Sequence, residues 1–259
     1  MAESHPQQRL RILVLNPNSS DSMTKGMVAA VEKLSLQDSI ELVTYTAPAA
    51  APASIDDQRD IDSSTQAVLD DANLAEDLKS SKYDAVLVAC FSVHPLVSSL
   101  AKYQHLAVTG ILEASIATAL SLNPAPVNSE RWGIVTTGTF WEEHLGNGVK
   151  KFLGQDTRAG NERFAGVFST GLTAGDFHTI SPEEVRVKLK NATKKLLASG
   201  NVSCVVMGCG GMAGLEDVIR TTAVDVYGKP TGEQVYIIDG VKAGILQLEQ
   251  AIRSQRAFR

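Results

Sequence analysis

Short apolar, strand-like runs alternate with helix-like segments along this chain, and the same alternation occurs twice. The first half opens with the apolar run 11–16, a helical pattern at about 22–34 and a second run at 40–45. Past the middle of the chain, the pattern starts again with the run 132–137 and a helical pattern at 141–152. Apolar strands separated by helices are typical of parallel sheets covered on both faces. The sequence therefore predicts an α/β protein built from two similar halves.

The remaining predicted elements continue this order in both halves. In the first half they are a helix at 64–79, a strand ending at Cys90, a helix at 95–103, a strand at 106–109 and a helix at 113–122. In the second half they are a strand at 163–168, a helix at 182–199, a strand ending at Cys209, a strand at 235–239 and a helix at 241–252. Each half is thus predicted to hold a mainly parallel, four-stranded sheet flanked by helices.

A proline-containing segment lies almost at the middle of the sequence. Residues 123–129 read Asn-Pro-Ala-Pro-Val-Asn-Ser, which combines two prolines with turn-forming neighbours. Such a segment is typical of a domain boundary. We expect an N-terminal domain over 1–125 that carries Cys90 and a C-terminal domain over 126–259 that carries Cys209, with the last helix able to cross back to the first domain.

The composition excludes several classes of function. The chain has 259 residues, of which 44% are hydrophobic and 20% charged, as in ordinary globular proteins. Its net charge of −5 and its scattered Lys and Arg residues give no basic surface for nucleic acid or an anionic membrane. The polar start of the chain resembles no secretion signal, and no apolar run approaches the ~18 residues of a membrane helix. We expect a cytoplasmic protein with neither a nucleic acid nor a membrane as partner.

Cys90 and Cys209 occupy matching places, each at the end of a strand and before a turn into a helix. The distance along the chain from Asn16 to Cys90 nearly equals that from Thr137 to Cys209, as an internal duplication requires. Because ligands of open α/β sheets gather at the carboxyl ends of the strands, two thiols are predicted to face one cleft between the halves. Racemisation needs such a pair of acid–base groups. Cys204 lies inside its strand and is interpreted as a small core residue.

The predicted chemistry requires a reactive sulfur. A thiol with a pKa near 8.5 is only a few per cent thiolate at neutral pH, and lowering that pKa by two units needs about 2.7 kcal/mol. A helix N-terminus usually supplies only about 0.3–1 kcal/mol. We therefore expect hydrogen bonds to the two sulfur atoms from the backbone of Phe91, Ser92, Gly210 and Gly211.

Other polar residues at the same predicted edge have two equally open interpretations. Asn16 either holds a substrate carbonyl group or forms a turn and helix cap, and the same choice applies to Thr136 and Thr137. His94 precedes a proline and is interpreted as a helix cap. The other histidines show no metal-ligand spacing with the cysteines, and no P-loop or G-x-S-x-G motif occurs. We expect neither a metal nor a cofactor.

The segment Gly208-Cys-Gly-Gly-Met-Ala213 also fits the dinucleotide pattern G-x-G-x-x-G/A. A nicotinamide-binding domain has this pattern in its first βα unit, whereas here it belongs to the third unit of the second half. The glycines are therefore interpreted as positions where backbone amides approach a small polar ligand.

Three motifs together resemble the hydantoin racemase branch of the aspartate/glutamate racemase superfamily. They are Leu15-Asn-Pro-Asn-Ser-Ser20 followed by Met23-Thr24, then Ala89-Cys-Phe-Ser-Val-His-Pro-Leu96, and finally Gly208-Cys-Gly-Gly-Met-Ala213. The second is most similar to fungal allantoin-cluster relatives. The resemblance implies two pseudo-symmetric, Rossmann-like α/β domains with the active site in the interdomain cleft. It also implies cofactor-independent racemisation of 5-substituted hydantoins or allantoin, with Cys90 and Cys209 as the catalytic thiols.

We also expect a set of residues beside the cysteines and at the matching strand ends to contact a hydantoin-type ring. These are Asn16, Phe91, Ser92, Val93, Thr136, Thr137, Gly210 and Gly211. Val93 departs from bacterial members, which often have an acidic residue near this point, so the substrate stays open. Alternatives are an amino-acid racemase, a maleate isomerase, a decarboxylase, a cysteine-nucleophile hydrolase, or a protein that only binds small molecules. Members commonly form homo-oligomers, which we also expect here.

Overall fold

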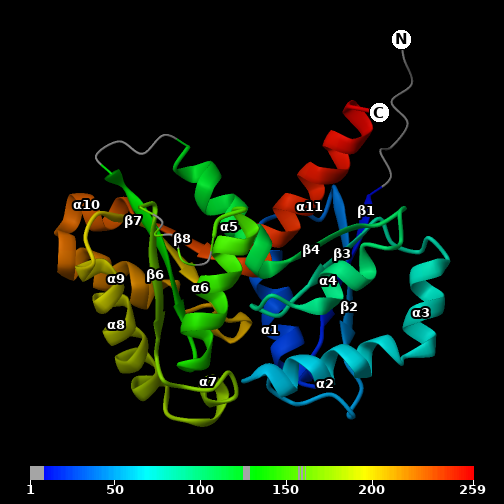
Figure 1. Ribbon diagram of the computed structural model, residues 1–259, viewed down its shortest axis with the longest axis horizontal. Helices are drawn as coiled ribbons and strands as arrows, with labels where there is room; N and C mark the ends of the chain where they lie inside the picture. Colours follow the sequence, from blue (N-terminus) through cyan, green and yellow to red (C-terminus); the bar gives the residue numbers. More distant parts are fainter. Residues whose placement is uncertain (1–8, 125–128, 157, 159, 161) are drawn as a thin grey trace.

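The structure is a computed structural model, which describes residues 9–124, 129–156, 158, 160 and 162–259 (Figure 1). We call the described residues before the gap at 125–128 the first lobe and those after it the second lobe. The predicted domain boundary between residues 125 and 126 lies outside the described residues and stays a prediction.

Each lobe contains one four-stranded sheet, and all strand pairs are parallel. The first sheet has the order β2-β1-β3-β4, with β1 Leu10–Asn16, β2 Ile40–Thr46, β3 Ala85–Val88 and β4 Ala107–Gly110; the second has the order β6-β5-β7-β8, with β5 Arg131–Thr136, β6 Phe164–Ser169, β7 Val202–Met207 and β8 Tyr236–Asp239. Because the two orders match strand for strand, the predicted α/β class with two similar parallel sheets is confirmed.

Helices flank both sheets. They are α1 Asp21–Glu32, α2 Gln58–Leu69, α3 Ala72–Lys79, α4 Pro95–Leu100, α5 Ile111–Leu122, α6 Phe140–Phe152, α7 Asp176–Thr179, α8 Pro182–Ala198, α9 Glu216–Tyr227, α10 Lys229–Gln234 and α11 Gly240–Ala257, with a 3₁₀ turn, η2, at Gly210–Met212. None of the helices in the described part of the chain has the length and apolar character needed to cross a bilayer.

Two sequence expectations about helices are wrong. The helix predicted at 64–79 is two helices, because Asp71 accepts hydrogen bonds from the backbone N–H groups of Asn73 and Leu74 and so starts α3. The helices α7 and α10 are absent from the prediction, and α9, the helix expected after the turn at Cys209, is predicted without bounds. In α9 half of the residues are β-branched, which lowers helix propensity, and packing of its buried face against α8 overrides that preference.

The central strands β1, β3, β5 and β7 are buried on both faces, as their apolar runs predict, whereas the edge strands β2, β6 and β8 are partly exposed. In β1, Ile12 and Val14 point into a core that continues into the second lobe, whereas Leu13 and Leu15 point into a separate core of the first lobe. Successive side chains of a strand point to opposite faces of its sheet. A strand with apolar residues at every position is therefore held from both sides.

The helices α5 and α11 join the lobes. The helix α11 follows β8 of the second sheet yet packs on β3 and β4 of the first, and α5 follows β4 yet packs on β7 and β8 (Figure 1). Close approach is possible because Gly244 of α11 has no side chain where it meets Leu87 of β3. Thr109 of β4 adds a hydrogen bond of 3.0 Å to Gln247 of α11. Each lobe thus supplies a helix that covers the sheet of the other lobe.

His94 connects α4 to α2. Its Nδ1 accepts from the backbone N–H of Leu96, which confirms the predicted cap, and its Nε2 lies 3.1 Å from Oγ of Ser64. The Ser64 hydroxyl donates to the carbonyl oxygen of Ile61, so Nε2 carries the proton that Ser64 accepts. Burial lowers the pKa of His94 to about 4.

The close approach of α11 to the first sheet can be tested with two glycine substitutions. Gly244→Ala places a methyl group against Leu87, so we expect a loss of stability, since overpacking costs about 1–3 kcal/mol. Gly26→Ala is the matched control, because Gly26 lies in α1 with nothing within 4 Å. It should raise stability by about 0.5–1 kcal/mol through helix propensity. Urea unfolding measures both, and equal effects would contradict the packing.

His94 predicts a pH dependence of stability. The unfolded chain binds a proton at the ordinary pKa of about 6.5, whereas the folded chain does so only near 4. Stability is therefore complete above pH 6.5 and lost as the pH falls toward 4, by about 2 kcal/mol between pH 7 and pH 5. In His94→Asn, which keeps a capping side chain, this part of the pH dependence should vanish from urea unfolding curves. An unchanged slope would contradict it.

Candidate active site

Cys90 and Cys209 each lie two residues beyond the end of a central strand, β3 and β7, at the carboxyl edges of the two sheets. Both line one small, partly open pocket between the lobes. The pocket is lined by Asn18, Met23, Met27, Ile55, Ala89, Cys90, Phe91, Thr137, Trp141, Ala174, Gly208, Cys209, Gly210 and Gly211. Its volume is about 30 Å³, room for one or two water molecules. The structure thus brings the two sulfur atoms of opposite lobes to the same small space.

Both sulfurs accept hydrogen bonds, and the backbone N–H of Met212 also acts on Cys209. Ser92 donates through its hydroxyl group to Sγ of Cys90 at 3.3 Å, and Gly211 donates through its backbone N–H to Sγ of Cys209, also at 3.3 Å. The second bond makes Cys209 the cap of η2. The arrangement agrees with the expectation that Ser92 and Gly211 serve the sulfurs, but the donor at Cys90 is a side chain instead of the backbone.

Burial dominates the acidity of both thiols. It raises the pKa of Cys90 to about 12 and that of Cys209 to about 11, and the hydrogen bonds at sulfur offset only part of this effect. The negative charge of Asp56 raises both pKa values further, and Cys209 also raises the pKa of Cys90. The thiol pKa values are thus raised, not lowered as the sequence analysis expected, because burial outweighs the donors near the sulfur atoms. Both cysteines are thiols at neutral pH in this closed form.

Asn16 and Thr136 lie behind the pocket and are fully buried. The Asn16 amide donates to Oδ1 of Asn18 at 2.9 Å and accepts from the Asn18 backbone N–H. The Thr136 hydroxyl donates to the carbonyl oxygen of Gly208 at 2.9 Å. Asn16 therefore fixes Asn18, and Thr136 fixes the loop that carries Cys209.

Val93 lies at a contact between the lobes and outside the pocket lining. Its Cγ2 is 2.5 Å from the place where a Cβ on Gly148 of α6 would be, so this glycine makes room for it. Ser92 also lies outside the lining, although it contacts the sulfur of Cys90. The other expected contact residues, Phe91, Thr137, Gly210 and Gly211, line the pocket.

Several lining residues escaped the sequence analysis. Met23 and Trp141 lie in the first turns of α1 and α6, which are the helices that follow β1 and β5. The internal duplication was the signal that could have found them. Asn18 was also missed: its Nδ2 has only the thioether of Met23 as a neighbour, at 3.3 Å, and a thioether is a weak acceptor. Its amide N–H groups are therefore available to a ligand.

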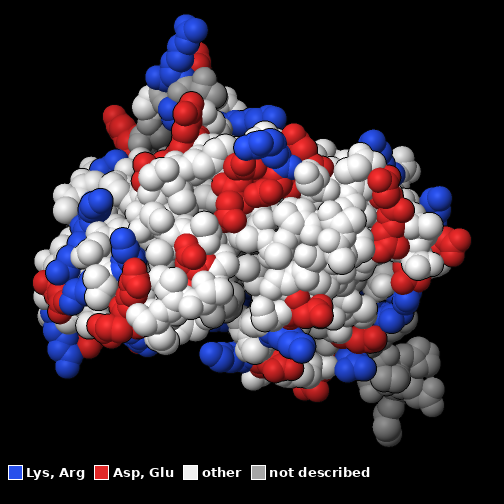
Figure 2. All heavy atoms as spheres, turned by 90° about the horizontal axis from the view of Figure 1, so that it is seen from below, with Lys and Arg blue, Asp and Glu red and all other residues white. Residues whose placement is uncertain are grey.

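Among the described residues that line the pocket there is no Lys, Arg or His. In Figure 1, α2 and α7 lie below both sheets, and Figure 2 views the molecule from that side: Lys and Arg are interspersed with Asp and Glu there, around a broad uncharged area. Within the described ranges, no group of three or more His, Cys, Asp or Glu is arranged to hold a metal ion. What the lining offers is amide, hydroxyl and backbone donors, apolar walls and two thiols.

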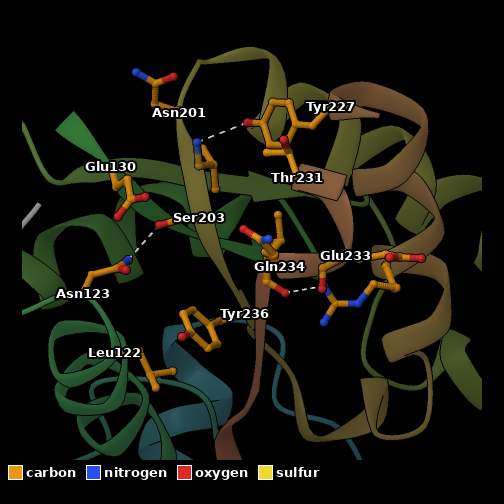
Figure 3. Close-up of a pocket in the computed structure, with 13 residues that line it drawn as sticks. Leu122, Asn123, Glu130, Asn201, Ser203, Tyr227, Thr231, Glu233, Gln234 and Tyr236 are labelled. Carbon is orange, nitrogen blue, oxygen red and sulfur yellow. Dashed lines mark hydrogen bonds between the residues drawn. The ribbon is translucent and has the colours of Figure 1, made fainter. Parts of the chain in front are cut away.

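A larger cavity of about 780 Å³ lies at the opposite edge of the second sheet, beside the first residues of β7 and β8 (Figure 3). Tyr227, Tyr236 and Arg220 are among its lining residues. The Arg220 guanidinium donates to the carbonyl oxygens of Gly232 and Glu233, at 3.1 and 2.9 Å, and of Val235, so its charge is already bound. Since it contains no thiol, we assign the chemistry to the smaller pocket.

Comparison with known proteins gives consistent matches over nearly the whole chain. The model of the Asp/Glu/hydantoin racemase family matches residues 12–248. Protein DCG1 from Saccharomyces cerevisiae is 32% identical and aligns with 82% of this chain and 86% of its own. A hydantoin racemase from Pseudomonas sp. (strain NS671) is 26% identical over 91% of this chain and 83% of its own. The crystal structure of allantoin racemase from Pseudomonas fluorescens superposes with a TM-score of 0.73 at 23% identity, covering 95% of this chain and 92% of its own.

The matched region begins in β1 and ends in α11, so it contains both sheets, both cysteine loops and the two helices exchanged between the lobes. This extent confirms the resemblance that the three sequence motifs indicated. The chain belongs to the Asp/Glu/hydantoin racemase family, which places it among the isomerases.

Proposed function

We propose that this protein is a cofactor-independent racemase that inverts C5 of a 5-substituted hydantoin or of allantoin by proton transfer between two cysteines. The observation that carries the proposal is that Cys90 and Cys209, from opposite lobes, line one small, partly open pocket. A ligand held there has one sulfur on each side. The similarity to a protein named hydantoin racemase supports the substrate class.

In the proposed reaction, one cysteine acts as thiolate and takes the C5 proton. The electron pair of the C5–H bond becomes that of an enolate, which spreads onto the neighbouring ring carbonyl group. The other cysteine, as thiol, gives its proton to the opposite face of C5 and is left as thiolate. The two sulfurs have then exchanged protonation states, and the mirror-image substrate is converted by the reverse sequence.

The enolate oxygen needs hydrogen-bond donors that are in place before the proton leaves. Nδ2 of Asn18, the hydroxyl group of Thr137 and the backbone N–H of Gly210 belong to the pocket lining and are the donors we assign to it. The pocket of about 30 Å³ is far below the ~300 Å³ of usual ligand sites, so the lobes or their loops must separate to admit a ring.

The raised thiol pKa values fit a weak carbon acid. Burial makes each thiolate rarer, but it also makes the thiolate that does form a stronger base toward a C–H bond. The hydrogen bonds from Ser92 and Gly211 stabilise the negative charge on each sulfur while it is a thiolate. Activity then depends on thiolate formed when the ligand is bound.

The pocket favours a neutral substrate. An amino acid, maleate or a malonate brings at least one carboxylate, and the described lining residues offer no cation to pair with it. A hydantoin or allantoin ring instead presents carbonyl and N–H groups, which match amide and backbone donors and acceptors. This separates the proposed reaction from the amino-acid racemase, maleate isomerase and decarboxylase alternatives.

Replacing either cysteine by serine tests the two-thiol mechanism. A serine hydroxyl is a far weaker acid than a thiol, so Cys90→Ser and Cys209→Ser should each lower racemisation by about 10²–10⁴-fold. One single mutant is expected to keep exchanging the C5 proton of one enantiomer for solvent deuterium. Polarimetry with single-enantiomer hydantoins, allantoin, aspartate and glutamate, together with NMR, measures both.

The matched control for these variants is Cys204→Ser, because Cys204 is buried inside β7 and its sulfur lies outside the pocket. It should keep near-normal turnover. Wild-type turnover in the Cys90→Ser/Cys209→Ser double mutant would reject the mechanism. A protein that binds hydantoins without changing their optical rotation would be a binding protein instead.

The thiol pKa values can be measured without substrate. Because Cys90 and Cys209 titrate near 12 and 11, alkylation of each by iodoacetamide should keep rising with pH, about tenfold per unit, from pH 7 to pH 10. Peptide mass spectrometry reads the two cysteines separately. A plateau below pH 9 at either cysteine would show that its thiolate is stabilised in the free protein.

A further inference from the structure

Asp56 lies at the edge of the thiol pocket and reaches from one lobe to the other. It follows Ile55 in the loop between β2 and α2, and its Oδ1 accepts a hydrogen bond of 3.2 Å from the backbone N–H of Ala174 in the second lobe. Ile55 and Ala174 both line the pocket. The side chain of Asp56 therefore ties together the two loops that close the pocket.

This bond and the hydrogen bond between Asn123 and Ser203, which also joins the lobes, lie at opposite edges of the second sheet. Asn123 at the end of α5 donates to Oγ of Ser203 in β7 at 2.9 Å, and this contact lies where β7 begins, at the far edge of the second sheet. The Asp56 bond lies at the carboxyl edges, beside the thiols. Opening of the pocket has to break the Asp56 bond, whereas the Asn123 bond can stay intact.

Asp56 also brings a negative charge close to both sulfurs. It is the carboxylate whose charge acts on Cys90 and on Cys209, whereas Glu113 acts on Cys90 alone. The backbone N–H of Ala174 is a neutral partner and cannot cancel the charge. Since the described lining residues include no Lys, Arg or His, a second negative charge in the pocket would be repelled without compensation.

We propose that Asp56 is a specificity-determining residue that holds the pocket closed across the lobes and excludes ligands with a negatively charged substituent. This inference rests on the proposed function for its substrates, which it restricts to hydantoin-type rings with a neutral 5-substituent. Two unit charges ~8 Å apart at an effective dielectric constant of ~20 repel each other enough for a discrimination on the order of ten-fold or more.

Two alkylating reagents of nearly equal size test the charge without any assumption about the reaction. Iodoacetamide is neutral and iodoacetate is anionic, and both transfer a two-carbon group to a thiolate with loss of iodide. We expect wild-type Cys90 and Cys209 to prefer iodoacetamide over iodoacetate by at least ten-fold more than free cysteine does. In Asp56→Asn, which keeps a side-chain oxygen for the Ala174 N–H, this preference should fall about ten-fold.

Two further variants separate charge from closure. Asp56→Ala removes both the charge and the bond to Ala174, so it should lose the preference and also speed the reaction with neutral iodoacetamide. Glu142→Gln is the matched control: Glu142 is exposed and accepts from the backbone N–H of Ser169 at 2.9 Å, with no effect on either thiol among those described. It should react like the wild type.

The outcomes are distinct. An unchanged reagent preference in Asp56→Asn, or an equal change in Glu142→Gln, overturns the proposal whether or not the protein is a racemase. In a second arm, wild-type kcat/KM is compared for hydantoin-5-acetamide and hydantoin-5-acetate, and Asp56→Asn should narrow the ratio about ten-fold. If neither compound is racemised while the reagent preference behaves as expected, the proposed function fails and the role of Asp56 in excluding anions stands.

Discussion

The packing of α5 and α11 across the two lobes is the constraint on which the site depends. Each helix follows the last strand of one sheet and covers strands of the other. With these helices in place, β3 and β7 end at a shared cleft, and the loops that follow them face each other. Glycines at the contact, such as Gly244 against Leu87, let the backbones come close. The position of one sulfur relative to the other thus depends on the apolar packing of α5 and α11 against the sheets, which lies away from the thiols.

Burial of the two thiols makes their thiolate forms costly in free energy, and few nearby groups offset that cost. Removing a thiolate from water is costly, the hydrogen bonds at the sulfurs offset only part of that cost, and the described lining residues add no cation. In the proposed reaction this desolvation cost persists throughout, because the negative charge passes from one sulfur to the enolate and then to the other sulfur. The negative charge of Asp56 adds to it. A pocket of this kind suits a substrate that brings no charge of its own.

Much of this architecture could be predicted from the sequence because parallel sheets leave a strong periodic signal. The apolar runs predicted the four strands of each half in their order along the chain, and the turn glycines and serine placed Cys90 and Cys209 at matching strand ends. The finer assignments depend on side-chain direction, which periodicity does not contain. Asn16 and Asn18 are two residues apart in one turn. The side chain of Asn16 makes its hydrogen bonds within that turn, whereas Asn18 lines the pocket.

The same limit explains the other differences. Val93 follows the cysteine loop in sequence, but its contact with α6 of the other lobe exists only once the lobes are assembled. Met23 and Trp141 lie in the first turns of their helices, and only the assembly of the two lobes brings those turns to the cleft. Burial, which sets the thiol pKa values, is likewise a property of both lobes together.

The two sulfurs have different donors, a serine hydroxyl at Cys90 and a main-chain amide at Cys209. Mirror-image molecules have equal free energy in solution, so a racemase built on this site must have the same kcat/KM for both hands of its substrate whatever the chemistry of each half. The unlike donors can therefore affect only kcat and KM separately. The enantiomer with the lower KM must have a kcat that is lower by the same factor.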